Sequence, residues 1–120
     1  MQPAGSRREL GAAGEDLAAA WYQERGYDIL ARNWRCRAGE LDLVLRRGRT
    51  YVFCEVKTRT TAAFGTPLEA VTPTKQARLR RLAVRWLREG RPSGATPAGQ
   101  LRFDVAAVLG GHLEVVEEAF

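Results

Sequence analysis

Two segments of the chain repeat their apolar residues at the three- and four-residue spacing of an α-helix. The first segment begins at Ser6-Arg7-Arg8-Glu9, which has the pattern of a capping box, and ends at Gly26. The second begins at Thr72-Pro73, a cap followed by a proline suited to the first helical position, and continues to about Glu89. Its apolar stripe consists of Leu79, Leu82, Ala83, Trp86 and Leu87. The pattern predicts two amphipathic helices.

Five shorter segments have the patterns of β-strands. One is predicted over residues 39–45, where polar and apolar residues alternate from Glu40 to Leu43. Another is predicted over residues 51–57, which place apolar side chains on both faces, as in a buried central strand. The other strands, the last two joined by a tight turn at Gly110-Gly111, are predicted over residues 27–32, 101–109 and 112–116. The order αβββαββ predicts an α/β fold in which helices flank a mixed central sheet.

Two glycines interrupt the first predicted helix. Gly11 and Gly14 each cost about 1 kcal/mol relative to alanine at a helix interior. This cost indicates a close approach of the backbone either to DNA or to the sheet. Glu15 lies beside these small residues and has room to reach inward, although an ordinary exposed helix glutamate has the same pattern.

Length and composition indicate one domain. The chain has 120 residues, of which 45% are hydrophobic and 28% are charged. We expect residues 1–120 to form a single domain, with residues 91–99, rich in proline and glycine, as a flexible loop inside it. Cys36 and Cys54 show no disulfide framework, and no apolar run has the length of a signal core or a membrane span. We therefore expect a cytoplasmic protein without membrane contact.

The charge balance points to an anionic partner. A formal net charge of +5 and a pI of about 9.9 are most simply explained by nucleic-acid binding. Much of the positive charge falls on the second predicted helix, where acidic partners at four-residue spacing are scarce. A solvated helix face is the alternative. The basic residues of this helix considered for phosphate contact are Lys75, Arg78, Arg81, Arg85 and Arg88.

Acidic side chains come together where the two central strands would pair. A four-residue loop over 47–50 makes Arg46 pair with Tyr51 and places Asp42 opposite Glu55. A two-residue loop keeps both carboxylates on one face, whereas an odd-length loop sends them to opposite faces. Facing carboxylates repel each other and raise each other's pKa, which a bound cation would relieve.

These residue types suit a magnesium site. Mg²⁺ prefers oxygen ligands and usually takes one or two carboxylates together with waters and phosphate oxygens. Asp42 and Glu55 could supply the carboxylates, the carbonyl of Val56 a third ligand, and Lys57 could orient a water or neutralise charge on a phosphate. In the same register Glu40 falls opposite Lys57. The alternative is a glutamate and lysine that only pair with each other on a solvated strand face.

The residues of this hairpin resemble a known family. The runs Asn33-Trp34-Arg35-Cys36-Arg37-Ala38-Gly39-Glu40-Leu41-Asp42 and Phe53-Cys54-Glu55-Val56-Lys57-Thr58-Arg59 are similar to the bacterial YraN-like endonuclease-like proteins. Through them the chain resembles the Holliday-junction resolvase branch of the PD-(D/E)xK nuclease superfamily. The likeness extends from Gly11 to Val105, and Leu41 stands where the superfamily name has a proline.

The resemblance implies a restriction-endonuclease-like fold and a specific site. It implies that Asp42 and Glu55 hold Mg²⁺ or Mn²⁺, that Lys57 assists the attacking water, and that Glu15 on the first helix completes the site. The function that it implies is a metal-dependent endodeoxyribonuclease acting on branched or otherwise non-standard DNA.

Two alternatives to a nuclease stay open at this point. One is a nucleic-acid-binding module that cleaves nothing, and the other is an interaction protein whose acids are structural. DNA is the expected partner, and a homodimer is an open option. We expect Trp34 to belong to the core. The residues expected to contact nucleic acid are Arg35, Arg37, Arg59, Lys75, Arg78, Arg81 and Arg85.

Overall fold

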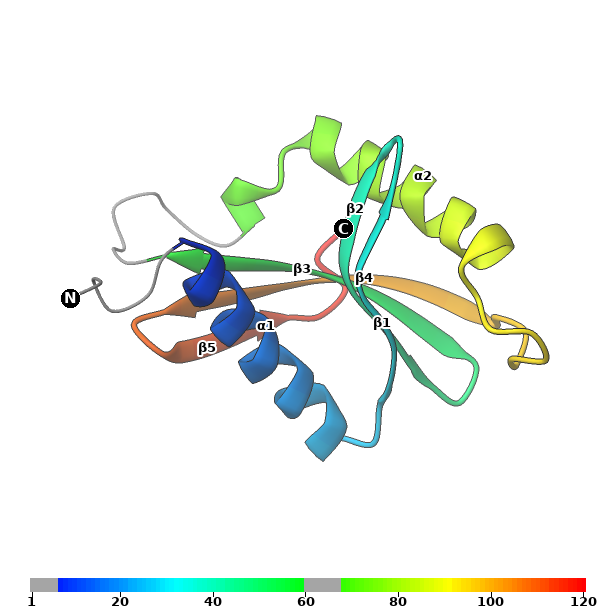
Figure 1. Ribbon diagram of the computed structural model, residues 1–120, viewed down its shortest axis with the longest axis horizontal. Coiled ribbons are helices and arrows are strands. Elements are labelled where there is room, and N and C mark those ends of the chain that lie inside the picture. The colour runs from blue at the N-terminus through cyan, green and yellow to red at the C-terminus, as the bar shows by residue number, and fades with distance from the viewer. Residues whose placement is uncertain (1–6, 60–67) are drawn as a thin grey trace.

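The computed structural model describes residues 7–59 and 68–120, which form an α/β structure with helices on both faces of a five-stranded sheet (Figure 1). The observed element order confirms the predicted αβββαββ arrangement. One short 3₁₀ turn precedes the second helix, where the pattern Thr66-Pro67-x-Glu69 predicts a short helical turn. The elements are α1 (Arg7–Glu24), β1 (Asp28–Cys36), β2 (Gly39–Arg47), β3 (Thr50–Arg59), η1 (Leu68–Ala70), α2 (Pro73–Glu89), β4 (Gln100–Leu109) and β5 (His112–Val116).

The sheet is mixed, as predicted. Its strand order is β1-β2-β3-β4-β5, and every neighbouring pair is antiparallel except β3 and β4, which are parallel. Parallel neighbours need a crossover connection, and η1 and α2 lie in that connection. The β4–β5 hairpin turns at Gly110 and Gly111, whose φ values of 56° and 80° suit a tight hairpin turn.

The predicted register of the central hairpin is confirmed. Arg46 pairs with Tyr51, although the turn is tighter than a four-residue loop because Arg47 also pairs with Thr50. Gly48 has a φ of 61°, which a two-residue turn requires. The paired stretch ends at Leu43 and Cys54, so Asp42 and Glu55 are the next residues beyond it.

The two faces of the sheet carry separate apolar cores. Tyr51 and Phe53 pack in one cluster with Trp86 of α2, whereas Val52 and Cys54 pack in the other with Tyr22 of α1. This alternation along β3 confirms that both faces of the strand are buried. Because each helix covers one face, residues that alternate along a strand are directed either to the α1 side or to the α2 side.

The expected caps of α2 are present. The Thr72 hydroxyl accepts a hydrogen bond from the backbone N–H of Lys75 (3.3 Å), Pro73 begins the helix, and the Gly90 N–H donates to the carbonyl of Trp86 (2.7 Å). Four of the five predicted stripe residues are buried, and Leu87 is partly buried. The capping box expected at Ser6 lies outside the described residues, as do Thr66 and Pro67 at the start of the predicted helical turn.

β1, β2 and β3 extend past the ends predicted at residues 32, 45 and 57. β1 extends to Cys36, so Trp34 and Arg35 lie in a strand, because Trp34 pairs with Leu41 and packs against the core on the α2 side. The core position expected for Trp34 is thus confirmed. β3 extends to Arg59 because its parallel pairing with β4 continues along its whole length.

Within the described ranges, no helix is long and apolar enough to cross a membrane. Cys36 and Cys54 are both free thiols, as expected.

Gly14 lies where α1 approaches the sheet. A Cβ atom at this position would overlap Oγ1 of Thr58 on β3 and would lie 3.5 Å from Val108 Cγ2. Of the two explanations for the helix glycines, close approach to the sheet therefore holds for Gly14. For Gly11, no atom lies within 4 Å of the added Cβ.

We expect Gly14→Ala to destabilise the protein by about 1–2 kcal/mol, because the overpacking outweighs the gain in helix propensity. Thr58→Ala removes the overlapping Oγ1 atom and should relieve most of this loss. Its own cost should be small, because the buried Thr58 hydroxyl has no hydrogen-bond partner in the described part of the chain. Urea unfolding of both single variants and the double variant measures the coupling. Simple additivity of the two substitutions would contradict the overlap.

Candidate active site

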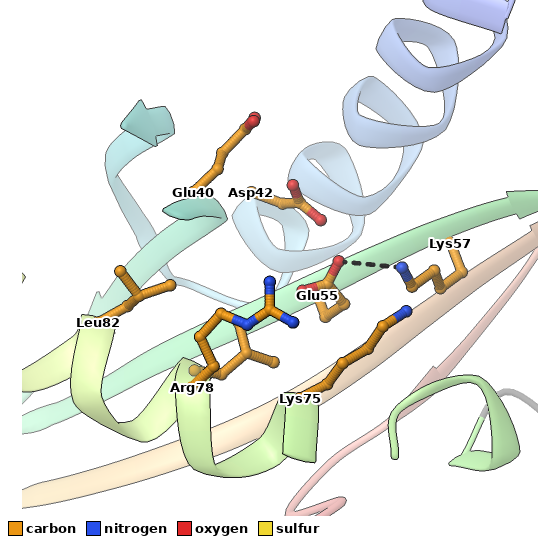
Figure 2. A pocket seen from close by; sticks show the side chains of 8 residues that line it. Glu40, Asp42, Glu55, Lys57, Lys75, Arg78 and Leu82 are labelled. Atoms are coloured by element: carbon orange, nitrogen blue, oxygen red, sulfur yellow. Dashed lines mark ion pairs between the residues drawn. The ribbon is translucent and has the colours of Figure 1, made fainter. Parts of the chain in front are cut away.

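The predicted acidic residues lie at one cavity between the sheet and α2. The cavity has a volume of about 290 Å³ and opens where the pairing of β2 and β3 ends (Figure 2). Its lining residues come from β2, β3 and α2, and they are Glu40, Asp42, Glu55, Lys57, Lys75, Arg78, Leu79 and Leu82. The structure thus brings together three of the four residues expected to form the site, Asp42, Glu55 and Lys57.

Asp42 is the most perturbed acid of the cavity. Its Oδ2 accepts a hydrogen bond from the backbone N–H of Val56 at 2.8 Å. Burial raises the pKa of Asp42 well above its usual range, and the Glu55 carboxylate raises it further, while the hydrogen bond from Val56 opposes the shift. Asp42 therefore holds a proton more readily than an ordinary carboxylate does.

Glu55 and Lys57 form an ion pair on the same face of β3. Lys57 Nζ lies 3.4 Å from Glu55 Oε1, and the Glu55 side chain retains 17% of its exposure (Figure 2). Two-residue spacing along a strand directs both side chains into the cavity. The ammonium group is therefore next to the carboxylate pair.

Glu15 lies near the cavity but outside its lining. It projects from α1, where its Oε1 accepts a hydrogen bond from the side-chain amide of Asn33 (2.9 Å), and Arg32 Nη2 is 3.8 Å away. Its side chain is only 14% exposed, which distinguishes it from an ordinary surface glutamate. Its charge contributes to the raised pKa of Asp42, so Glu15 acts on the site electrostatically.

Asn33 holds Glu15 through an unusual backbone conformation. Its φ of 52° is in the left-handed region, which asparagine tolerates better than most residues. The single sequence contains no local pattern that marks this position.

Glu40 is a cavity residue to which the sequence assigned no role. It shares the face of Asp42 on β2 and pairs with Arg35 Nε at 3.2 Å. The alternation of side chains along the strand predicts that Glu40 lies on the face of Asp42, opposite Lys57. This alternation is the sequence signal by which Glu40 could have been assigned to the site.

The basic residues expected to contact nucleic acid divide into two groups. Lys75 and Arg78 line the cavity and face the acids from α2 (Figure 2). Outside the cavity, Arg81 is exposed, and Arg85 pairs with Glu89 at 3.0 Å. Glu89 follows Arg85 by four residues, so at least one of the basic residues of α2 has an acidic partner on the same helix. Of the others, Arg35 is held by Glu40, Arg37 is exposed, and Arg59 lies at the end of β3.

The donor set fits a hard divalent cation. No group of three or more histidine, cysteine, aspartate or glutamate side chains suitable for a metal occurs among the described residues. Two adjacent carboxylates are nevertheless the number that Mg²⁺ usually takes from a protein. The contact shown for Val56 involves its N–H. A strand residue directs its N–H and carbonyl to the same neighbouring strand, so the Val56 carbonyl faces the side of Asp42.

The fold and this cavity define an α/β protein with a carboxylate pair and two basic helix residues around one site. Residues 14–108 match the model of a family described as "Uncharacterised protein family UPF0102". The chain belongs to this family, which confirms the family part of the resemblance to YraN-like proteins.

Its relatives cover nearly the whole chain. A UPF0102 protein of Acidothermus cellulolyticus is 52% identical over 128 residues, covering 98% of this chain and 97% of the relative. A UPF0102 protein of Nocardia farcinica is 53% identical, covering 94% of this chain and 87% of the relative. A third, from Rhodococcus opacus, is 50% identical, with 92% and 95% covered.

Proposed function

We propose that the protein is a metal-dependent endodeoxyribonuclease that hydrolyses phosphodiester bonds, with branched or otherwise non-standard DNA as its substrate. The observation that carries this proposal is the cavity in which Asp42 and Glu55 lie next to Lys57, with basic residues of α2 opposite. Membership of the PD-(D/E)xK superfamily, and the preference for branched DNA in its Holliday-junction resolvase branch, are proposed from the resemblance of the hairpin motifs.

Asp42, Glu55 and the Val56 carbonyl would hold Mg²⁺ or Mn²⁺. When bound, the cation would polarise the phosphodiester and make a coordinated water a better nucleophile. The raised pKa of Asp42 fits this role, because a buried pair of carboxylates is stabilised when a cation replaces the proton. Glu15, which is held by Asn33, would add negative charge behind Asp42.

Lys57 would orient the attacking water or neutralise charge on the phosphate. Its Nζ is fixed by the Glu55 carboxylate, and an ammonium group keeps further N–H donors for a water or a phosphate oxygen. Exposed basic residues, including Arg37 and Arg81, would contact the DNA backbone outside the cavity.

The decisive experiment is a cleavage assay on four DNAs, a four-way junction, a flap, a single strand and a duplex, each with Mg²⁺, Mn²⁺ or chelator. We expect cleavage of the junction or flap that the chelator abolishes. Binding without cleavage of any DNA would support the non-catalytic nucleic-acid module. Neither binding nor cleavage would support an interaction protein.

We expect Lys57→Ala to lower the cleavage rate at least about tenfold while DNA affinity changes by less than about twofold, because one backbone charge among many contributes little to binding. Single-turnover cleavage and fluorescence anisotropy measure the two effects. Arg49→Ala removes the same charge in the exposed turn between β2 and β3, away from the cavity, and should cleave normally. Normal cleavage by Lys57→Ala would reduce Lys57 to an ion-pair partner of Glu55.

A further inference from the structure

We propose that Lys75 and Arg78 form a seat for a single phosphate group of the nucleic-acid backbone, across the cavity from Asp42 and Glu55. This inference rests on the proposed function for its choice of ligand. It concerns binding alone and requires no cleavage. It also separates these two residues from the other basic residues of α2.

The two side chains share the cavity with the acids. Figure 2 shows Lys75 and Arg78 extending from α2 towards Glu55 and Lys57 of β3, and all four residues line the same space. The three-residue spacing places both basic residues on one face of the helix. A phosphate between the helix and the sheet would therefore meet cations from α2 and the carboxylate pair from β2 and β3.

The charges of the cavity are unevenly paired. Lys57 pairs with Glu55, and Glu40 pairs with Arg35, which lies outside the lining. Within the part of the chain that the structure describes, Arg78 has neither an ion pair nor a hydrogen bond. Among the described residues, the one polar partner of Lys75 Nζ is the carbonyl of Ala70, at 3.5 Å. Two cations of the cavity are thus left without a carboxylate partner.

Gly39 lies beside the part of α2 that faces the cavity. A Cβ atom at Gly39 would lie 3.7 Å from Arg78 Cδ and 3.2 Å from Leu82 Cδ1. The φ of 145° at this residue is also strained for a residue with a side chain. The start of β2 therefore lies beside Leu82 and the aliphatic part of Arg78, two residues that line the cavity.

Lys75 occupies a position that disfavours a cation. It is the third residue of α2, and the first turn contains no acidic residue. The positive end of the helix dipole repels a lysine there. Glutamate or glutamine would instead complete a capping box with Thr72. A residue that destabilises its own helix is expected at functional positions. A bound anion would offset the repulsion between Lys75 and the helix dipole.

The geometry of Lys75 and Arg78 suits the binding of one phosphate group better than a diffuse attraction to many anions. An arginine fork can bind two oxygens of one phosphate, and lysine adds a compact charge beside it. The outer arginines are placed differently, since Arg85 is engaged by Glu89 and Arg81 lies outside the cavity, whereas Arg78, although exposed, lines it. Lys75 and Arg78 are therefore expected to bind one group at a defined place.

The test uses d(TpT), which carries one phosphodiester, and inorganic phosphate, each titrated by NMR into the protein in chelator. We expect d(TpT) to shift the signals of the Arg78 Nε–H and the Gly39 amide. Arg78→Gln and Lys75→Gln should each weaken this binding at least about fivefold. Arg49→Gln, the same substitution in the exposed turn between β2 and β3, should leave it unchanged.

Melting temperatures distinguish this role from a structural one. Lys75→Gln should melt at the same temperature as the wild type or higher, because it removes the repulsion and completes the capping box. Loss of d(TpT) binding without loss of stability would support the seat. A lower melting temperature for Lys75→Gln would assign the lysine to the fold and overturn its part in the seat.

Three further results would overturn the proposal. They are the absence of shifts with d(TpT), equal weakening by Arg49→Gln and Arg78→Gln, and tighter binding of inorganic phosphate than of d(TpT). The last result would assign the seat to free phosphate. Binding in chelator is independent of cleavage. If the wild type binds d(TpT) through these residues but cleaves no DNA, the nuclease proposal is refuted and the phosphate seat is supported. If the protein cleaves DNA but binds d(TpT) independently of Lys75 and Arg78, the nuclease proposal is supported and the phosphate seat is refuted.

Discussion

Asp42→Asn is expected to lower DNA cleavage at least about a hundredfold and to weaken divalent-cation binding more than about tenfold, or about 1.4 kcal/mol. Asparagine keeps an oxygen that can accept the hydrogen bond from the Val56 N–H, so the local backbone should not change. What the substitution removes is the negative charge next to Glu55. Calorimetry with Mg²⁺ and Mn²⁺ measures the binding, and the junction assay measures the cleavage.

The same substitution should stabilise the metal-free protein. Because the folded state raises the pKa of Asp42, it binds a proton that the unfolded chain releases in the pH range between the ordinary and the raised pKa. The free energy of unfolding of the wild type should therefore fall as pH rises through that range. Asp42→Asn has no carboxyl group that takes up this proton. At a pH above that range the variant should therefore be more stable than the wild type by on the order of 1 kcal/mol, and this difference should shrink as the pH falls.

Asp16→Asn provides the matched control. Asp16 is an exposed acid of α1 that pairs with Arg32 at 2.7 Å, outside the cavity. This variant should bind cations, cleave DNA and unfold as the wild type does. Undiminished cation binding by Asp42→Asn would remove Asp42 from the site, whereas a lower stability at alkaline pH would contradict the raised pKa.

Asp104→Ala is expected to lower the free energy of unfolding by about 3–5 kcal/mol. Asp104 has no solvent exposure, and it accepts hydrogen bonds from the Tyr22 hydroxyl (2.5 Å), from Arg102 Nε and Nη2 (both 2.9 Å) and from the Glu118 N–H (3.1 Å). Alanine would leave these donors without their acceptor and the Arg102 charge partly buried. Removing one partner of such a buried pair costs more than the pair contributes.

Urea unfolding followed by circular dichroism measures the loss. Glu117→Ala is the control, because Glu117 pairs with the same arginine at 3.4 Å but is half exposed, so its effect should stay within about 1 kcal/mol. A change below about 1 kcal/mol for Asp104→Ala would mean that the network contributes little. Asp104 lies on the α1 face with Tyr22, so cation binding by the folded variant should be unaffected.

The regular elements and the central register were predictable because their signals are local. The caps at Thr72-Pro73, the stripe of α2 and the alternation along β2 and β3 each depend on residues within one element. The short turn between β2 and β3 then determined that Asp42 follows the paired stretch opposite Glu55. Periodicity and turn length together were enough to bring Asp42, Glu55 and Lys57 to one face.

Other features depend on which elements meet, and no local pattern reports that. β1 is longer than its own pattern indicates because pairing with β2 stabilises it. Glu15 lies behind the cavity because Asn33 of β1 holds it. The sequence by itself therefore determined the helices, the strands and the face on which the acids lie. The division of the α2 cations into Lys75 and Arg78 inside the cavity and Arg81 and Arg85 outside it was decided only by the tertiary structure, because it depends on which part of α2 packs over the ends of β2 and β3.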